Sequence, residues 1–367
     1  MKLQRVLVLN AGSSSLKWSV LDAESEAVTL SEEGEWADAE PREREALIHR
    51  ALDSAGEVKA IGHRVVHGGM LFRDAVRADQ DTINRLESLN ELAPLHNPLA
   101  LECLEAALRA RPHVVQVAAF DTAFHHTIPD KAALYAIPRR WTERWGIRRF
   151  GFHGLSVSYA ARRAAEALNG MPQRHVVCHL GAGCSITAVR DGRSVDTTMG
   201  FTPLEGLMMA TRSGSVDPGL LLYLAQHGLT ITELNDGLEH HSGLLGVSGV
   251  SADIRDILAV AEKGNEAARI AVDMFIYRII RAVGALAAVL GGIDVLTFTG
   301  GVGEHAAVVR ERVIRGLAYL GVRVDDAVNR QGNGDRDIGS PASTARILVL
   351  KAREDLSILR EVKRLTS

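Results

Sequence analysis

The sequence is poor in cysteine and has no excess of either charge. Its 367 residues contain three cysteines, Cys103, Cys178 and Cys184, at no spacing typical of a disulfide framework or a zinc site. This usage predicts a reducing compartment. Lysine and arginine number 42 against 45 acidic residues, so the formal net charge is −3. A chain without a basic excess lacks the electrostatic footprint of a nucleic-acid-binding protein, so no nucleic-acid partner is expected.

Long uncharged apolar runs are also missing. The most apolar long segment, residues 270–290, contains Asp273, Arg278 and Arg281, which argues against a membrane span. The first apolar run stops at Asn10, too early for a signal peptide. These features predict a cytoplasmic protein with no membrane partner. The chain is too long for one compact core and has no proline-rich linker, so we expect two continuous domains.

Several catalytic motifs are absent. No GxxxxGK[ST] sequence occurs, which excludes a P-loop enzyme. No HExxH or Cys/His framework occurs, so zinc is not expected despite many histidines. Gly300, Gly301 and Gly303 lie between a predicted strand and a predicted helix, but the spacing does not complete a dinucleotide fingerprint, which disfavours a dehydrogenase. A nucleotide could approach such a glycine turn closely, and a purely structural turn fits equally well.

The chain does contain a strand–turn–strand unit near its start. Residues 6–9 form an unbroken apolar run, as a strand buried on both faces does. Residues 10–14 have turn composition, and residues 15–20 then alternate between polar and apolar. The tip offers accessible N–H groups, hydroxyls and Lys17, which suit a phosphate. An ordinary hairpin with a polar tip explains this stretch alone equally well.

The same pattern recurs at residues 175–191. In this alignment Asn10 corresponds to Gly181, and Gly12 corresponds to Gly183. One long-period repeat predicts two similar halves. We therefore expect two glycine turns that face each other and hold the two ends of a polyphosphate.

Other stretches predict the surroundings of a site. Asp121 comes directly after an apolar strand at residues 114–120, where ligands of α/β sheets bind. Arg64 and Arg212 each lie in glycine-rich sequence, and phosphoryl transfer needs such cations. Taken singly, each arginine is as well explained as a surface residue. Asn97 is predicted to cap a helix.

Three further segments predict long elements. Residues 81–92 and 304–319 predict helices. Residues 264–290 predict a long helix whose apolar residues nearly encircle it, which is typical of a buried helix or a subunit contact.

Nine motifs occur in a fixed order: VLNAGSSSLKWSVLD, IGHRVVHGG, LAPLHNP, FDTAFHHTIP, FGFHGLS, CHLGAGCSITAV, TTMGFTPLEGLMMATRSGSVDPG, GLLGVSGVSADIRD and FTGGVGEH. Together they resemble the acetokinase family, a branch of the actin, hexokinase and heat-shock ATPase superfamily, over nearly the whole chain. The resemblance implies an α/β fold of two duplicated ribonuclease H-like (actin-like ATPase) domains, with a nucleotide cleft between them, and a homodimer. We expect one domain at residues 1–123 plus 355–367, and a nucleotide-binding and dimerising domain at 124–354.

The resemblance also implies a reaction. It is the reversible, in-line transfer of a phosphoryl group from ATP to acetate, giving acetyl phosphate and ADP, with Mg²⁺ or alternatively Mn²⁺. Acetate is already an anion, so the enzyme must bring two anions together rather than supply a strong base. Two alternatives stay open. One is a kinase for propionate or another short-chain acid, and the other is a weakly catalytic nucleotide-binding switch.

The site residues follow from the same resemblance. The catalytic residues are Asp121, Arg64, Arg212 and His153. Acetate would be bound by Arg64, with Val66, Leu95, Phe152 and Pro203 around its methyl group. The nucleotide would be bound by Ser14, Lys17, His179, Gly181, Gly183, Asp253, Arg255, Gly300, Gly301 and Gly303. The metal would be bound by Asn10 and Glu354, and His96 is a further active-site residue.

Five positions depart from the family pattern. Ala182 stands where the second phosphate loop usually has Asn. His305 and Ala306 replace an Asn-Ser pair, and Ala352 and Arg353 replace Thr-Asn. These changes lie on the nucleotide side of the expected site. They bear on the phosphoryl donor and the rate more than on the acyl chemistry.

Overall fold

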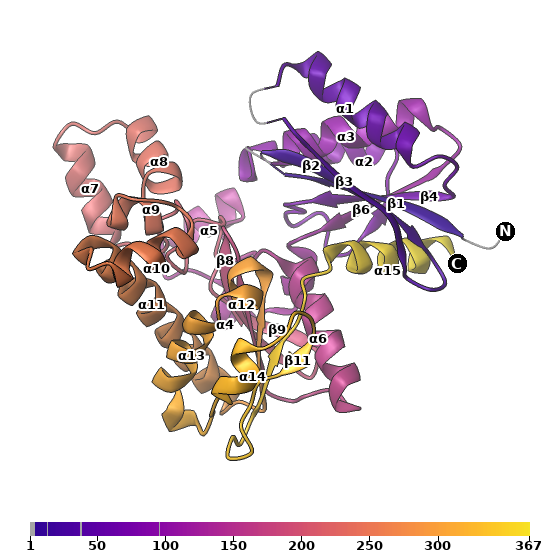
Figure 1. The fold of residues 1–367 in the computed structure, drawn as a ribbon. Helices are drawn as coiled ribbons and strands as arrows, with labels where there is room; N and C mark the ends of the chain where they lie inside the picture. The colour runs from indigo at the N-terminus through magenta and orange to yellow at the C-terminus, as the bar shows by residue number, and fades with distance from the viewer. Residues whose placement is uncertain (1–3, 13, 37–38, 95) are drawn as a thin grey trace. The chain divides into compact units, whose positions relative to one another are not determined.

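The computed structural model describes residues 4–12, 14–36, 39–94 and 96–367. Leu95, which the resemblance assigns to the acetate site, lies outside the described residues. The chain divides into two compact units (Figure 1). Unit 1 comprises Met1–His126, Phe152–Tyr159 and Arg353–Ser367, and unit 2 comprises Thr127–Gly151 and Ala160–Ala352. Phe152–Tyr159 thus groups with the N-terminal residues, whereas the boundaries expected from the sequence placed it in the second domain.

Unit 1 is built around a mixed sheet. Its strands are β1 (Arg5–Ala11), β2 (Ser15–Asp22), β3 (Val28–Glu35), β4 (Ala60–Val65), β5 (Val76–Arg77) and β6 (Val115–Phe120). Its helices are α1 (Pro41–Ser54), α2 (Gln80–Glu87), α3 (Asn97–Ala110) and α15 (Glu354–Thr366), with 3₁₀ turns η1 (Asn90–Leu92) and, at its boundary, η2 (Ala123–Thr127). The strand order is β3-β2-β1-β4-β6-β5, with β1, β4 and β6 parallel.

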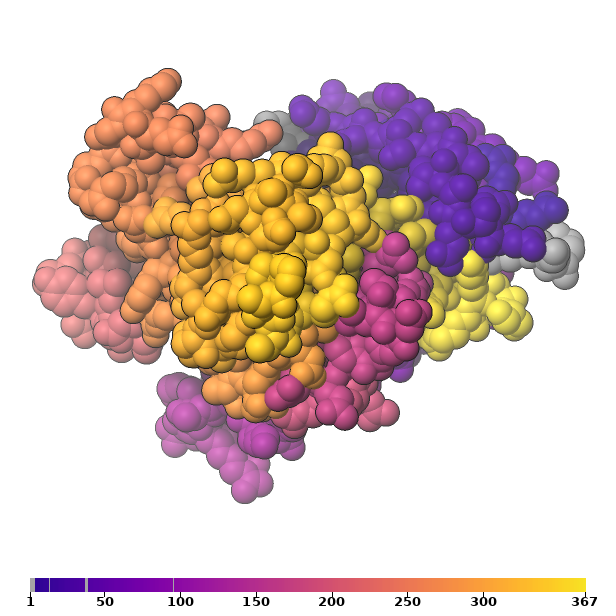
Figure 2. Space-filling model, turned by 60° about the horizontal axis from the view of Figure 1, so that its bottom comes forward, coloured from indigo at the N-terminus to yellow at the C-terminus, as the bar shows by residue number. Residues whose placement is uncertain are grey.

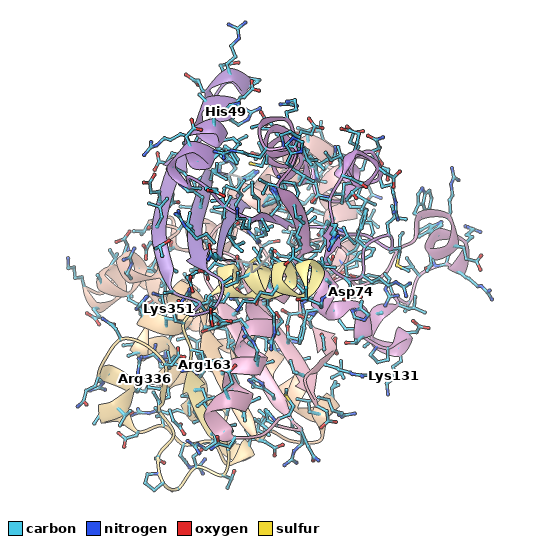
Figure 3. All side chains as sticks on the ribbon, turned by 90° about the vertical axis from the view of Figure 1, so that its right-hand side faces the viewer. His49, Asp74, Lys131, Arg163, Arg336 and Lys351 are labelled. Atoms are coloured by element: carbon cyan, nitrogen blue, oxygen red, sulfur yellow. The ribbon has the colours of Figure 1, made fainter. Side chains whose placement is uncertain are left out.

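Odd-numbered and even-numbered residues of β1 lie on opposite faces of this sheet. Successive side chains of a strand point to opposite faces. Odd-numbered residues of β1, such as Leu7 and Leu9, belong to the core cluster that contains residues of α1, α2 and α3. Even-numbered Val6 and Val8 belong to the cluster that contains residues of α15, which lies along the other face (Figure 3). A Cβ atom on Gly62 of β4 would come within 2.3 Å of α15, so glycine is required at this contact.

Unit 2 repeats the same architecture with more helices. Its strands are β7 (His175–Leu180), β8 (Cys184–Arg190), β9 (Arg193–Thr197), β10 (Val295–Thr299), β11 (Arg336–Asp337) and β12 (Arg346–Val349). Its helices are α4 (Asp130–Ala133), α5 (Arg139–Trp145), α7 (Pro218–Gln226), α8 (Ile231–His240), α9 (Gly243–Ser248), α10 (Ile254–Glu262), α11 (Glu266–Leu290), α12 (Gly300–His305), α13 (Ala307–Gly316) and α14 (Asp326–Arg330), with a 3₁₀ turn η3 (Ala318–Leu320). Helix α6 (Gly154–Leu168) begins in unit 1 and continues in unit 2.

The two sheets confirm the predicted duplication. The order in unit 2 is β11-β12-β10-β7-β8-β9, which reproduces unit 1 strand for strand. In both sheets the first three strands form an antiparallel meander, and the first strand pairs in parallel with the fourth. Two halves with one topology are what a long-period sequence repeat predicts.

The register corrects the alignment of the two copies. Asn10 and His179 each lie one residue before the end of the first strand of their sheets, and each pairs with both neighbouring strands. Asn10 therefore corresponds to His179, whereas Gly181 lies in the turn beyond β7. In this register Gly12 corresponds to Gly181. The motif alignment matched Gly12 to the second glycine of the turn, Gly183, and therefore shifted the first strand by two residues.

The helix predicted at residues 81–92 is too long. Helix α2 ends at Glu87, and a 3₁₀ turn follows it. The predicted capping role of Asn97 is also wrong, because His96 holds the N-cap position of α3. The Asn97 amide instead accepts a hydrogen bond from the backbone N–H of His67 (3.1 Å) and donates one to its carbonyl (3.0 Å).

The helix predicted at residues 304–319 has different bounds. The glycine turn is itself helical as α12. The helix is interrupted at Ala306, and α13 begins at the next residue. The long helix predicted at 264–290 is confirmed as α11, which ends at Gly291 in the left-handed region with φ 77°. Among the described residues, no helix is long and apolar enough to cross a membrane.

Several histidines are fully buried, as expected for ordinary core residues, and they include His63, His125 and His175. Burial lowers their pKa values to about 4, about 4 and about 3, respectively. The Nε2 atom of His63 lies 2.8 Å from the side-chain oxygen of Gln116, which fixes the ring in β4. A buried neutral imidazole links folding to pH.

We expect His63 to make the stability of unit 1 depend on pH. Its pKa is about 4 in the folded chain against an ordinary 6.5, so the unfolded chain takes up the proton first as the pH falls. The neutral ring therefore contributes stability above pH 6.5 that is lost toward pH 4. Between pH 7 and pH 5, the free energy of unfolding should fall by about 2 kcal/mol more in the wild type than in His63→Gln.

Urea unfolding followed by tryptophan fluorescence measures this difference. Trp18 and Trp36 are buried in unit 1 and report on it, once the two exposed tryptophans of α5 are replaced by Phe. His49→Gln changes an exposed residue of α1 (Figure 3) and should keep the wild-type pH slope. Identical slopes for the wild type and His63→Gln would contradict the assignment.

Candidate active site

One row of the unit 1 sheet carries polar side chains. The register places Glu33, Lys17, Asn10 and Arg64 side by side across β3, β2, β1 and β4. Directly paired residues share a face, and the even-numbered residues of β1 face α15. Asp121 directly follows β6, so it lies at the same carboxyl edge of the sheet. The predicted placement of Asp121 beyond a strand end is confirmed.

Arg64 and Asp121 form a buried ion pair. The Asp121 carboxylate has no exposed surface, and Nη2 of Arg64 lies 2.5 Å from its Oδ2. Nε of Arg64 donates to both carboxylate oxygens at 3.2 Å. Burial raises the pKa of Asp121 to about 6, although the charge of Arg64 opposes this shift. Burial lowers the pKa of Arg64, but the charges of Asp121 and Glu354 outweigh burial and leave that pKa above its ordinary value.

Asn10 and Glu354 complete the cluster. The Asn10 side-chain oxygen accepts from Nη1 of Arg64 (3.0 Å), and its Nδ2 donates to Oε2 of Glu354 (3.2 Å). The Glu354 Oε2 also lies 3.6 Å from Nε of Arg64. Ser156 donates to the other Glu354 oxygen at 2.8 Å. Glu354 is the first residue of α15, and a helix N-terminus favours a carboxylate.

The loop that carries His153 is fixed against Asp121. His153 has φ 58°, in the left-handed region that side chains rarely adopt. The next residue, Gly154, donates its N–H to the Asp121 carbonyl (2.8 Å), and a Cβ atom there would lie 2.2 Å from that oxygen. Nε2 of His125 contacts the Phe152 carbonyl at 2.9 Å on the other side. Backbone conformations of this kind, held in place by their surroundings, are found most often at active sites.

The described residues assigned to the methyl group belong to both units. In unit 1, Val66 and Phe152 are buried, and the Phe152 ring lies edge-on to His67 with centroids 5.4 Å apart. His96 is the N-cap residue of α3 in the same unit. Pro203 is half-buried and belongs to unit 2.

Ser14 and Lys17 lie on the exposed side of the first hairpin. The Lys17 ammonium contacts Glu33 at 3.4 Å, and both side chains are more than half exposed. Ser14 lines an open cavity of about 580 Å³ together with Glu35 and Trp36. Both residues are accessible to a ligand, and Lys17 stands beside Asn10 in the polar row.

In unit 2, Arg212 lies beside the second glycine turn. The backbone N–H of Ala210 donates to the carbonyl of Ala182, between Gly181 and Gly183 (3.0 Å). Nε of Arg212 lies 2.9 Å from a carboxylate oxygen of Glu239. His179 precedes this turn at the end of β7 and is almost fully buried. These nucleotide and catalytic candidates therefore share one edge of the unit 2 sheet.

The residues around Gly300 form a tight structural turn. Gly300 has φ 79°, and a Cβ atom on it would lie 2.7 Å from the Leu180 carbonyl. The Glu304 carboxylate accepts from the N–H groups of Gly300 (3.1 Å) and Ala352 (2.9 Å). Gly301 is exposed, with nothing within 4 Å of its Cβ direction, and Gly303 is buried.

Asp253 and Arg255 form one local unit. Asp253 caps α10 by accepting the Arg255 backbone N–H at 2.8 Å. The Arg255 guanidinium also contacts this carboxylate, and its hydrogen bond lowers the pKa of Asp253 to about 2. The Arg255 side chain is 82% exposed, so its planar face is open to a base.

Sequence reasoning missed several partners of these residues: Ser156, which binds Glu354; Glu239, which binds Arg212; Glu304, which binds the glycine turn; and Asn97, which holds His67. Most of these partners lie far along the chain from the residue that they contact. For the others, the residue type alone does not indicate the contact. Only Asn97 carried a local signal, and that signal indicated a helix cap.

These observations define the structural class of the protein. Two sheets of one topology, each with polar residues at the carboxyl edge of its parallel strands, define an α/β protein of the actin-like ATPase fold, as expected. The chain belongs to the acetokinase family, whose model matches residues 43–360. The family expected from the nine motifs is therefore confirmed.

Individual relatives match almost end to end. An acetate kinase from Heliobacterium modesticaldum is 42% identical over 394 residues, covering 98% of this chain and 99% of that protein. The solved structure of Porphyromonas gingivalis acetate kinase is 37% identical with a TM-score of 0.91, covering 99% of this chain and all of that one. A propionate kinase from Francisella tularensis is 36% identical, also with a TM-score of 0.91, covering 98% and 99%.

Gly154→Ala should reduce turnover more than stability. The added Cβ would push the Asp121 carbonyl away and shift Asp121, which holds Arg64, together with the adjoining His153. Misplacing reacting groups by about 1 Å can cost roughly 100-fold in rate, so we expect kcat to fall at least about tenfold. The measurement is steady-state kinetics of ADP formation together with a thermal melt.

Gly170→Ala is the matched control, because its Cβ meets nothing within 4 Å and its backbone is not left-handed. It should retain wild-type kcat. Full activity in Gly154→Ala would show that the contact with Asp121 does not fix the site.

Proposed function

We propose that the chain catalyses the reversible transfer of a phosphoryl group from ATP to acetate. The observation that carries this proposal is the buried Arg64–Asp121 pair with Glu354 and Asn10 beside it, at the carboxyl edge of the unit 1 sheet. Membership of a family whose matched relatives are named acetate kinases supports it. The enzyme would be a phosphotransferase with a carboxyl group as acceptor.

The chemistry requires two anions to approach each other. Arg64 would bind the acetate carboxylate, and Arg212 of unit 2 would bind the transferring phosphoryl group with His153. Guanidinium groups suit this task because they match carboxylate and phosphate geometry with paired donors. Asp121 holds Arg64 in one orientation, so the cation is in place before the substrates arrive.

The donor set fits a magnesium ion. Glu354 and Asp121 supply carboxylate oxygens and Asn10 supplies an amide oxygen, all hard ligands that Mg²⁺ prefers. Within the described residues there is no group of three or more His, Cys, Asp or Glu side chains that would form a protein-only cage. Mg²⁺ commonly uses one or two carboxylates plus substrate phosphates, so Glu354 and Asn10 would hold it beside the nucleotide. A bound ion would neutralise charge on the phosphates.

Unit 2 would bind the nucleotide. The turn at Gly181 and Gly183 and the glycines of α12 would lie close to the phosphates and the adenosine, while Arg255 offers an exposed planar guanidinium to the base. Ser14 and Lys17 of unit 1 would contact the phosphates. Within this proposal the chain works in the cytoplasm, which is supported by its free and buried cysteines.

Propionate is the second candidate acceptor. A solved structure titled as a propionate kinase is as similar in fold as the acetate kinase. Val66 and Phe152, with Leu95 and Pro203 assigned by the family, would set the size of the methyl pocket. One extra methylene changes discrimination by only about 1–3 kcal/mol, so slow use of propionate is compatible with an acetate kinase.

An activity panel tests the function. ADP formation is measured with acetate, propionate, butyrate or no acid, and with ATP, GTP or pyrophosphate as donor. We expect acetate-dependent turnover of ATP, with kcat/KM highest for acetate. Arg64→Ala and Arg212→Ala should each lower kcat/KM by roughly 100-fold or more, because each removes a charge that neutralises the reacting anions.

Arg269→Ala removes an arginine that pairs with Glu266 on the surface of α11 and should leave turnover unchanged. Near-wild-type rates in the purified Arg64 and Arg212 variants would refute their roles. A higher kcat/KM for propionate would favour the alternative acceptor. Turnover independent of any acid, or no turnover, would favour a nucleotide-binding switch.

We also propose that the chain forms a homodimer through unit 2. Helix α7 has no buried residue, and α7 and α8 form an exposed helical pair (Figures 1 and 2). The α7–α8 patch consists of Leu220, Leu222, Tyr223, Leu229 and Ile231, which are 40–85% exposed. Large exposed apolar patches mark interaction sites, and the family is expected to dimerise.

The double variant Leu222→Glu/Ile231→Glu should convert a dimer to a monomer, because each carboxylate would be buried unpaired in the contact. Sedimentation equilibrium should give about twice the chain mass of 39.6 kDa for the wild type and the single chain mass for the variant. Val28→Glu, at an exposed apolar position of β3 in unit 1, should stay dimeric. A monomeric wild type would disprove the dimer, and a dimeric variant would exclude this patch.

A further inference from the structure

Arg212 has a carboxylate partner that the family motifs do not contain. Its Nε lies 2.9 Å from Oε2 of Glu239, near the C-terminus of α8. The two side chains are only 22% and 14% exposed. Such an ion pair is partly removed from water and is therefore screened less than a surface pair.

The backbone around this pair is locked on both sides. The N–H of Ser213 donates to the Leu238 carbonyl (3.0 Å), and the N–H of Ser242 donates to the Thr211 carbonyl (2.9 Å). The Thr211 hydroxyl donates to the backbone carbonyl of Glu239 itself at 2.8 Å. The residues flanking Arg212 are thus hydrogen-bonded to the residues flanking Glu239.

The start of α8 is fixed as well. Thr230 and Glu233 form a capping box, in which each side chain accepts the other residue's backbone N–H. Beyond the C-terminus of α8, Gly243 at the start of α9 packs against the Arg212 loop. A Cβ atom on it would lie 2.3 Å from the Met209 carbonyl and 2.8 Å from the Arg212 carbonyl. The fold therefore presents the Glu239 carboxylate to Arg212 in a defined place.

The side of the guanidinium that Glu239 contacts is informative. The nearest approach is made through Nε, and the Nη1 and Nη2 groups form the distal end of the planar guanidinium. Arg64 differs, because its Nε and Nη2 donate to Asp121 and its Nη1 donates to Asn10. In Arg212 the Glu239 carboxylate lies at the Nε end of the guanidinium, and the distal Nη1 and Nη2 pair is the part that suits bidentate binding of a phosphate.

We propose that Glu239 is a positioning residue for Arg212 in phosphoryl transfer. This inference rests on the function proposed above. The Arg212 loop is hydrogen-bonded to the turn at Ala182, so an oriented guanidinium lies next to the expected phosphate site. Without the carboxylate, a long and flexible side chain would have to be ordered at each turnover, at an entropic cost. The opposite role, a carboxylate that competes with phosphate for Arg212, predicts faster turnover when it is removed.

The test compares Glu239→Ala and Glu239→Gln with Arg212→Ala and the double variant Glu239→Ala/Arg212→Ala. We expect Glu239→Ala to lower kcat at least about tenfold with a smaller change in KM for ATP. Glu239→Gln keeps an oxygen acceptor for Nε and should recover most of that loss. In the Arg212→Ala background, Glu239→Ala should have no further effect, because the positioned group is gone.

Glu266→Ala is the matched control, since Glu266 also pairs with an arginine, Arg269, but on the surface of α11. It should retain the wild-type kcat. If the wild type and this control show acetate-dependent turnover while Glu239→Ala is unchanged or faster, the positioning role is overturned and the proposed function stands. Additive losses in the double variant would indicate a structural role and also overturn it. A wild type without acetate-dependent turnover would instead refute the function itself.

Discussion

The burial of the Asp121 carboxylate against Arg64 is the constraint on which unit 1 depends. A carboxylate with no exposed surface is unfavourable unless it is paired and hydrogen-bonded, and Arg64 supplies that pairing through two nitrogens. Arg64 in turn needs its remaining nitrogen satisfied, which Asn10 does. Asn10 and Ser156 then hold Glu354 at the start of α15. One costly burial thus fixes elements that are remote in sequence.

The two units have the same sheet topology, but they carry different side chains at equivalent positions. In unit 1 the row at the carboxyl edge reads Lys17, Asn10 and Arg64, which brings cations to the edge. The corresponding row in unit 2 contains Ser185, His179 and Thr299 at the same register, all almost fully buried and none of them a lysine or an arginine. Arg212, a cation near this edge, comes instead from the loop that is hydrogen-bonded to the glycine turn. The two sheets share a topology but not the same polar side chains. Each unit therefore presents a different set of hydrogen-bond donors and charges at its carboxyl edge.

The sequence could predict those features that are local. An apolar run followed by turn residues located both hairpins, and the end of an apolar strand located Asp121, because these patterns lie within a few residues. Partners from distant segments, such as Ser156 for Glu354 and Glu239 for Arg212, left no local signal. The glycine-rich start of α12 resembles a loop in composition, yet it folds as a helix because Glu304 satisfies its first N–H group.

The departures from the family pattern are accommodated by the same kind of contact. Ala352 lacks the usual side chain, but its backbone N–H still reaches the Glu304 carboxylate that also holds Gly300. Ala182 lacks an amide, but its backbone carbonyl is the group that ties the Arg212 loop to the turn. In both places the structural role belongs to the backbone, which any residue supplies. At Ala182 and Ala352 the expected polar side chain is missing while the turns stay formed, so in the proposed enzyme these two departures would alter contacts to the nucleotide rather than the fold.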